Sequence, residues 1–127
     1  MRLLLDTHTF VYSFAEPHRL SRRVQNLLGD PGNERWVSAV SFWEISTKIQ
    51  IGKLKLPADR AYYSERLKDL QARPLPLELR HSLALFDLPR HHKDPFDRLL
   101  IAQAREEGLT LATRDEVFAR YPVETIW

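Results

Sequence analysis

The sequence predicts a single α/β domain built on a parallel sheet that helices cover on both faces. Two observations lead to this prediction. Short apolar runs, which suit buried strands, alternate along the chain with longer segments of helical periodicity. The 127 residues are enough for one hydrophobic core, and no repeat or linker-like tract divides them. We therefore expect one domain over residues 1–127.

The first strand is predicted at Arg2–Leu5, an apolar run that ends at Asp6. Turn-forming residues follow this strand, and apolar side chains then recur at helical spacing at Phe10 and Phe14. A break that contains a proline ends this first helix. A second helix is expected to begin after Ser21, whose hydroxyl can cap it.

The second strand is predicted at Trp36–Val40, and the next helix is expected to begin at Ser41 and to end at Gly52. With this boundary, Glu44 lies three residues after Ser41. That is the spacing of a capping box, in which an acidic side chain binds the start of its own helix. A structural explanation of Glu44 therefore depends on where the helix begins.

Three further elements are expected in the middle of the chain. A polar helix at Asp59–Ala72 is expected on the outside of the domain. The segment Arg73–Leu77 contains two prolines, so a strand there should lie near an edge of the sheet. A helix at Glu78–Leu88 follows. Its inward face is expected to comprise Leu79, Leu83 and Phe86.

Residues 91–104 show the clearest helix start in the chain. Asp94 can accept hydrogen bonds from the free backbone N–H groups of the first turn, and Pro95 suits the first helical position. The helix is apolar nearly all round over Leu99–Ala104, so most of its surface should be buried. Asp97 lies in the first turn, at the margin of that core.

The chain closes with two more predicted strands. The first is Leu109–Thr113, which follows a glycine that ends the preceding helix. A short helix is expected from Arg114, and the last strand at Tyr121–Trp127. Because strands and helices alternate to the end of the chain, the pattern indicates a mainly parallel sheet.

The composition excludes several classes of function. The sequence has no cysteine, which rules out disulfides, thiolate zinc sites and a cysteine nucleophile, and which fits a reducing cytoplasm. It contains no signal-peptide core, no run of transmembrane length, no HExxH, no G-x-S-x-G and no glycine-rich phosphate loop. The net charge of +2 and the isoelectric point of about 9.1 are compatible with a polyanionic partner.

Four acidic residues fall where predicted strands end or predicted helices begin: Asp6, Glu44, Asp97 and Asp115. In an open parallel sheet these positions share the carboxyl edge, where ligands bind. Carboxylates gathered there would repel one another, and a divalent cation would relieve the repulsion. A ligand set of oxygens alone favours Mg²⁺ or Mn²⁺ over zinc.

Each of these acids also has a structural explanation. Asp6 and Asp115 can cap helices, Asp97 can stabilise the first turn of its helix, and Glu44 fits a capping box. Joint placement on one edge favours a shared site over four separate caps. Phosphodiester hydrolysis is the chemistry that such a metal site supports most directly.

Basic side chains adjoin the acids and are candidates for contacts with phosphate. Lys48 lies one helical turn beyond Glu44, and the other candidates are His8, Arg98 and Arg114. Ion pairing with the neighbouring acids explains each of these residues equally well.

At these residues the chain resembles a known family, the PIN-domain ribonucleases of the VapC type, which are the toxins of type II toxin–antitoxin systems. The resemblance covers essentially the whole chain, and the third of its four motifs is long and specific. The motifs are Leu4–His8, Ser38–Lys48 with Gly52–Leu54, His92–Ala104, and Thr113–Asp115.

The resemblance implies a three-layer α/β/α sandwich and Mg²⁺-dependent cleavage of RNA, with Mn²⁺ as a possible substitute. It places the metal-binding, catalytic acids of the family on Asp6, Glu44 and Asp97, and a less regular fourth acid on Asp115. It also implies a homodimer and a small antitoxin protein, whose tail lies in a groove between the early helices. The candidates for the groove are Phe10, Tyr12, Phe14 and Trp43.

Two other interpretations remain open. A catalytically silent module of the same fold would bind RNA or protein, but it would be expected to have lost at least one acid. A phosphoacceptor signalling domain is also a small parallel α/β fold with clustered acids. The presence of Thr7 after Asp6, and of Arg114 where such domains carry a lysine, argues against that interpretation.

Overall fold

All 127 residues are described by the computed structural model, which contains one five-stranded sheet in the order β3-β2-β1-β4-β5. Every pair of neighbouring strands is parallel, which confirms the prediction. The strands are β1 (Arg2–Leu5), β2 (Glu34–Ser38), β3 (Arg73–Leu75), β4 (Thr110–Ala112) and β5 (Thr125–Ile126). The proline-containing β3 is an edge strand, as the sequence predicts.

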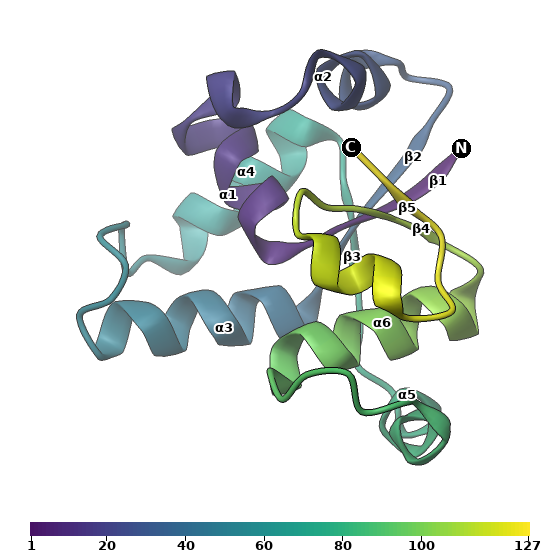
Figure 1. The fold of residues 1–127 in the computed structure, drawn as a ribbon. Coiled ribbons are helices and arrows are strands. Elements are labelled where there is room, and N and C mark those ends of the chain that lie inside the picture. Colours follow the sequence, from purple (N-terminus) through teal and green to yellow (C-terminus); the bar gives the residue numbers. More distant parts are fainter.

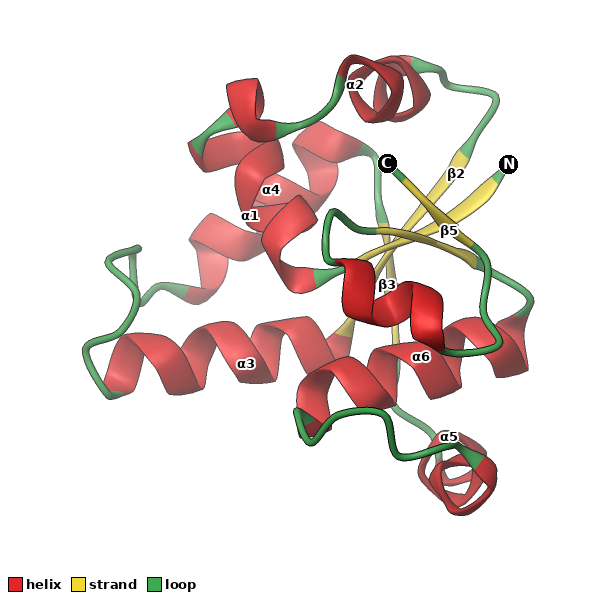
Figure 2. Cartoon of the chain, in the orientation of Figure 1, coloured by secondary structure: helices red, strands yellow, loops and turns green.

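Six α-helices surround the sheet (Figures 1 and 2). They are α1 (Thr7–Ala15), α2 (Arg22–Gly29), α3 (Ala39–Gln50), α4 (Arg60–Leu70), α5 (Leu79–Leu83) and α6 (Pro95–Glu107). Three short 3₁₀ helices complete the chain: η1 (Pro17–Arg19), η2 (Ala84–Asp87) and η3 (Glu116–Arg120). No helix is both long and apolar enough to cross a membrane.

Alternate residues of β1 face two separate hydrophobic clusters, which gives the domain its three layers. Leu4 packs with the buried residues of α6 and of β4. Leu3 and Leu5 point the other way, toward Phe10 of α1 and Ile45 of α3. Helices α1, α2 and α4 gather on one side of the sheet, and α5 and α6 lie on the other (Figure 1). The α/β/α sandwich is therefore confirmed.

Helix α3 begins earlier than the sequence predicts. Strand β2 ends at Ser38, whose hydroxyl accepts a hydrogen bond from the backbone N–H of Val40 at 3.0 Å and so caps the helix. Ser41 is fully buried inside the helix, where its hydroxyl accepts a hydrogen bond from Thr7. The predicted boundary at Ser41 was wrong, and the capping-box explanation of Glu44 fails with it.

The segment after β3 also differs from the prediction. Helix α5 is only five residues long, and η2 follows it directly. The predicted inward face is exposed to solvent: Leu79 is 73% exposed, Leu83 52% and Phe86 87%. The inward residue is His81, because its Nδ1 accepts the backbone N–H of Glu78 and its Nε2 lies 2.9 Å from the carboxylate of Glu107. Because these polar contacts hold His81 on the inward side, Leu79, Leu83 and Phe86 face the solvent.

Candidate functional site

Asp6 follows β1 at the carboxyl edge of the sheet and is 4% exposed. Its Oδ1 accepts the backbone N–H of Thr9 at 2.8 Å, which makes it the N-cap of α1. Its Oδ2 accepts the hydroxyl of Thr113 at 2.5 Å. Burial raises the pKa of Asp6, although these hydrogen bonds oppose the shift. The carboxylate is thus held rigidly at the end of the central strand.

Glu44 comes from the second turn of α3 and is 3% exposed. Its Oε2 pairs with the ammonium group of Lys48 at 2.5 Å, so the ion-pair interpretation of Lys48 is the one that the structure shows. Its Oε1 is buried and has no hydrogen-bond partner. A buried carboxylate oxygen without a donor is costly to the folded state, and it offers an open position to a cation.

Asp97 lies in the first turn of α6. Its pKa is raised to about 8, first by burial and then by the negative charges of Asp94, Glu44, Asp6 and Asp115. The structure therefore brings the acids into one electrostatic neighbourhood. Asp94 itself caps α6, because one of its oxygens accepts the backbone N–H groups of Phe96 and Asp97.

Asp115 is the most exposed of the four acids. Its carboxylate accepts the backbone N–H of Val117 at 3.0 Å and caps η3, so the expected structural role is present. Its own backbone N–H donates to the hydroxyl of Thr113 at 3.1 Å. Thr113 therefore connects Asp6 and Asp115, a link that the sequence did not reveal.

The residues at this edge have the chemistry of a site for a hard divalent cation. The potential ligands are all carboxylate oxygens, and one of them has no donor. Burial, and then repulsion from the neighbouring acids, raises the pKa of Asp97. No three of these side chains stand in ready coordination geometry. Binding a cation would therefore require some of them to rotate, which the exposed Asp115 has room to do.

The predicted phosphate-binding residues fall into two groups. His8 and Arg114 are exposed and their side chains make no hydrogen bond or ion pair, so they are free to meet a ligand. Arg98 donates to the backbone oxygen of Pro89 at 2.7 Å, and Lys48 is paired with Glu44. These last two side chains are engaged within the chain itself.

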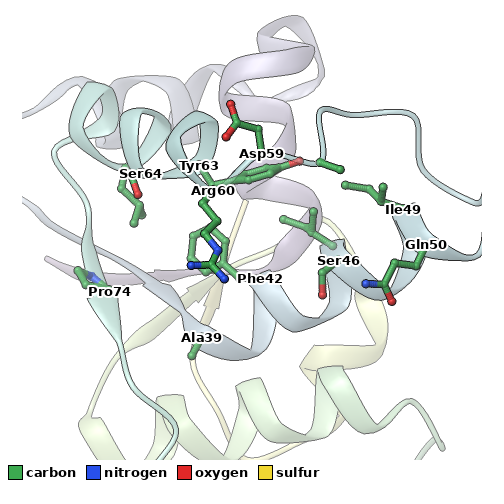
Figure 3. A pocket seen from close by; sticks show the side chains of 13 residues that line it. Ala39, Phe42, Ser46, Ile49, Gln50, Asp59, Arg60, Tyr63, Ser64 and Pro74 are labelled. Carbon is green, nitrogen blue, oxygen red and sulfur yellow. The ribbon is translucent and has the colours of Figure 1, made fainter.

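A cleft with a volume of about 760 Å³ lies between α3 and α4 and contains none of the four acids (Figure 3). Apolar side chains line most of it, among them Phe42, Ile49 and Tyr63. None of the four aromatic residues expected in a groove lines this cleft. Phe10 is fully buried in the core, whereas Trp43 is 52% exposed and packs edge-on against Phe96.

Comparison with known proteins identifies the family of this chain. The family model described as PIN domain matches residues 3–124. Ribonuclease VapC22 of Mycobacterium tuberculosis is 28% identical over 114 residues, which are 89% of this chain and 86% of that protein.

Solved structures show the same fold. The chain is similar to one in the crystal structure of VapBC2 from Rickettsia felis bound to a DNA fragment from its promoter, with a TM-score of 0.72 and 17% identity over 100% of this chain and 99% of that one. It is also similar to one in FitAcB from Neisseria gonorrhoeae, with a TM-score of 0.64 and 22% identity over 98% and 96% of the two chains. The fold and the family match together lead to one conclusion: this chain belongs to the PIN domain family.

Proposed function

We propose that the protein is a Mg²⁺-dependent endoribonuclease and acts as the toxin of a toxin–antitoxin pair. The observation that carries the proposal is the cluster of mutually repelling acids at the carboxyl edge, where Asp97 has a pKa of about 8 and an oxygen of Glu44 has no donor. The similarity to a protein named ribonuclease, and to chains from VapBC complexes, supports the choice of RNA and of a toxin.

In this proposal Asp6, Glu44 and Asp97 hold the metal, and Asp115 completes the set from its exposed position. A bound Mg²⁺, or Mn²⁺ in its place, would supply an activated water and would stabilise the charge that develops on the phosphate. Thr113 keeps Asp6 in place through its hydroxyl. The exposed His8 and Arg114 would contact the RNA backbone beside the acids.

The first experiment is RNA cleavage by the purified, antitoxin-free chain with Mg²⁺, with Mn²⁺ and with a chelator. Asp6→Asn is the matched control, because an asparagine oxygen can still accept the N–H of Thr9 and keep α1 capped. We expect metal-dependent cut sites that the variant does not produce. Equal cleavage by both proteins, or cleavage in chelator, would contradict the proposal.

The partner that we propose is a small antitoxin protein, bound along the cleft between α3 and α4. The cleft is apolar and borders α3, the helix that carries Glu44, and the similar chains come from structures of toxin–antitoxin complexes. Ser64→Arg places a charge in the cleft and should reduce co-purification of the antitoxin. Glu106→Arg, on the exposed face of α6, is the control that should retain it.

A homodimer is the assembly that we propose, with α5 and η2 at its interface. Leu79, Leu83 and Phe86 form an exposed apolar row there, on the opposite layer from the cleft. Phe86→Glu should shift the chain to a monomer in sedimentation experiments, and an unchanged mass would contradict this assembly. We also propose that the protein acts in the cytoplasm, where its RNA substrate and antitoxin would be.

A catalytically silent module that binds RNA or protein is the second candidate. Two observations favour it: Lys48 already neutralises Glu44, and no three acids stand in ready coordination geometry. Binding of Mn²⁺ by the chain separates the two candidates. A silent module would bind RNA without binding the metal.

A further inference from the structure

A chain of hydrogen bonds runs from the core to Asp97. The Nε2 of His92 lies 3.2 Å from Oδ2 of Asp97, and the Nδ1 of the same ring lies 2.6 Å from the hydroxyl of Tyr121. Tyr121 is 4% exposed and follows η3, so it comes from a distant part of the sequence. His92 is half-buried between the two.

The surrounding donors fix the direction of these hydrogen bonds. The oxygen of Tyr121 accepts the backbone N–H groups of His91 at 3.2 Å and of His92 at 3.1 Å, and the guanidinium of Arg98 lies 3.3 Å away. With its lone pairs engaged, the hydroxyl donates its own proton to Nδ1 of His92. The ring therefore carries its proton on Nε2, which donates to Asp97.

Fewer hydrogen bonds hold the carboxylate of Asp97 than hold the carboxylate of Asp6. Asp6 has two donors, which come from Thr9 and Thr113. Asp97 has one, His92, and its Oδ1 accepts no hydrogen bond. The loss of His92 would therefore leave the carboxylate of Asp97 free to rotate.

We propose that His92 and Tyr121 are positioning residues that hold Oδ2 of Asp97 and leave its Oδ1 free for a metal ion. This inference rests on the proposed function, because it takes Asp97 as a metal ligand. Groups that orient the ligands of a metal contribute to its affinity, and their removal typically weakens binding by about 10–100-fold. A role of His92 confined to anchoring its loop on η3 would leave metal affinity unchanged in a folded variant.

The test is a titration of the metal-free protein with Mn²⁺, followed by paramagnetic resonance of the free ion, for His92→Ala, His92→Gln and His91→Ala. We expect His92→Ala to bind Mn²⁺ about 10–100-fold more weakly than the parent chain. His92→Gln should recover most of the affinity, since its side-chain amide can donate where Nε2 does. His91→Ala is the matched control, because its ring contacts Tyr121 but makes no hydrogen bond to Asp97. Parental affinity in a folded His92→Ala variant would overturn the proposal.

A second measurement does not depend on the metal. Nitrogen NMR of the imidazole rings should show the neutral His92 ring as the Nε2–H tautomer, and Tyr121→Phe should change that signal. The Nδ1–H tautomer would overturn the proposal whether or not the chain binds Mn²⁺. If the parent chain instead showed the expected His92 signal and yet failed to bind Mn²⁺, that result would contradict the proposed function and the role of His92 in metal binding. The hydrogen bonds of His92 would then serve only to anchor its loop.

Discussion

Helix α6 carries two polar regions that differ in how well their groups are satisfied. In its middle, Gln103 is fully buried, accepts the hydroxyl of Ser38 at 2.5 Å and donates to the backbone oxygen of Pro76 at 3.2 Å. At its first turn, Asp97 faces the repulsion of four other acids. The first region holds α6 against β2 and against the segment that follows β3. The second region lowers the stability of the fold by gathering like charges, which is typical of binding sites.

The two acids near the ends of the helix show the same contrast. The pKa of Glu107 is lowered, chiefly because His81 and Arg80 bind its carboxylate. The pKa of Asp97 is raised, because burial and like charges disfavour its ionised form. Glu107 has the partners of a structural residue, whereas Asp97 is buried among like charges, as the proposed metal site requires. The predictions that follow test this difference.

The largest effect is expected for cleavage by Asp97→Asn. The variant should lose more than about 100-fold in the rate of metal-dependent RNA cleavage, because a charged ligand is replaced by a neutral one. Its metal-free form should melt at the same temperature or higher, since the repulsion among the acids is relieved. Asp94→Asn is the matched control, because asparagine caps a helix as well as aspartate does. A similar loss of cleavage in both variants would contradict the assignment of Asp97 as a metal ligand and of Asp94 as a helix cap.

Substitution in the region around Gln103, where the polar groups are paired, should lower the stability of the metal-free protein. Gln103→Met should lower the free energy of unfolding by about 2–3 kcal/mol, because Ser38 and the backbone oxygen of Pro76 would lose a buried partner. Urea denaturation of the metal-free protein measures this change. If Gln103→Met and Asp97→Asn shift stability in the same direction, the contrast between the two regions is wrong.

The pH dependence of the metal-free protein should show the cost of the acid cluster. The pKa of Asp97 rises from 3.8 to about 8 on folding, so the folded state binds a proton more tightly than the unfolded chain does. Its contribution to stability is present at low pH and is lost as the pH rises from about 4 to about 8. We expect the melting temperature to fall by a few degrees between pH 5 and pH 8, less steeply in Asp97→Asn, and Mg²⁺ to restore it at pH 8. If the melting temperature of Asp97→Asn fell with pH as steeply as that of the parent chain, Asp97 would not be the group responsible for the pH dependence.

The smallest effect concerns Asp94, which caps α6 and is not among the proposed metal ligands. Asp94→Ala should cost about 1 kcal/mol of stability through the loss of the cap of α6. Asp94→Asn should cost little. Thermal melts of the two variants provide the comparison, and equal losses would mean that charge, and not capping, is what Asp94 contributes.

Local chemistry let the sequence predict much of the fold. Asp94 and Pro95 begin α6, and Gly108 ends it in the left-handed conformation, because these residues act on backbone groups within a turn of themselves. The alternation of strands and helices predicted the parallel sheet, and the position of acids after strands predicted the carboxyl-edge cluster. The metal-binding roles of those acids stay a prediction.

Tertiary structure decided what depends on partners far apart in the chain. Ser38 rather than Ser41 caps α3: the hydroxyl of Ser38 accepts the N–H of Val40 and donates to Gln103, whereas the hydroxyl of Ser41 accepts a hydrogen bond from Thr7. Leu79, Leu83 and Phe86 face outward because His81 and Glu107 pair across the contact between α5 and α6.

The acids and their spacing were readable from the sequence alone, because each follows a strand or begins a helix within a few residues. The groups that hold them were not. Thr113 reaches Asp6, and Tyr121 reaches Asp97 through His92, only after the sheet has brought β1, β4 and α6 together. Hydrogen bonds between side chains have no period along the sequence, so only the folded chain reveals which acid has two donors and which has one.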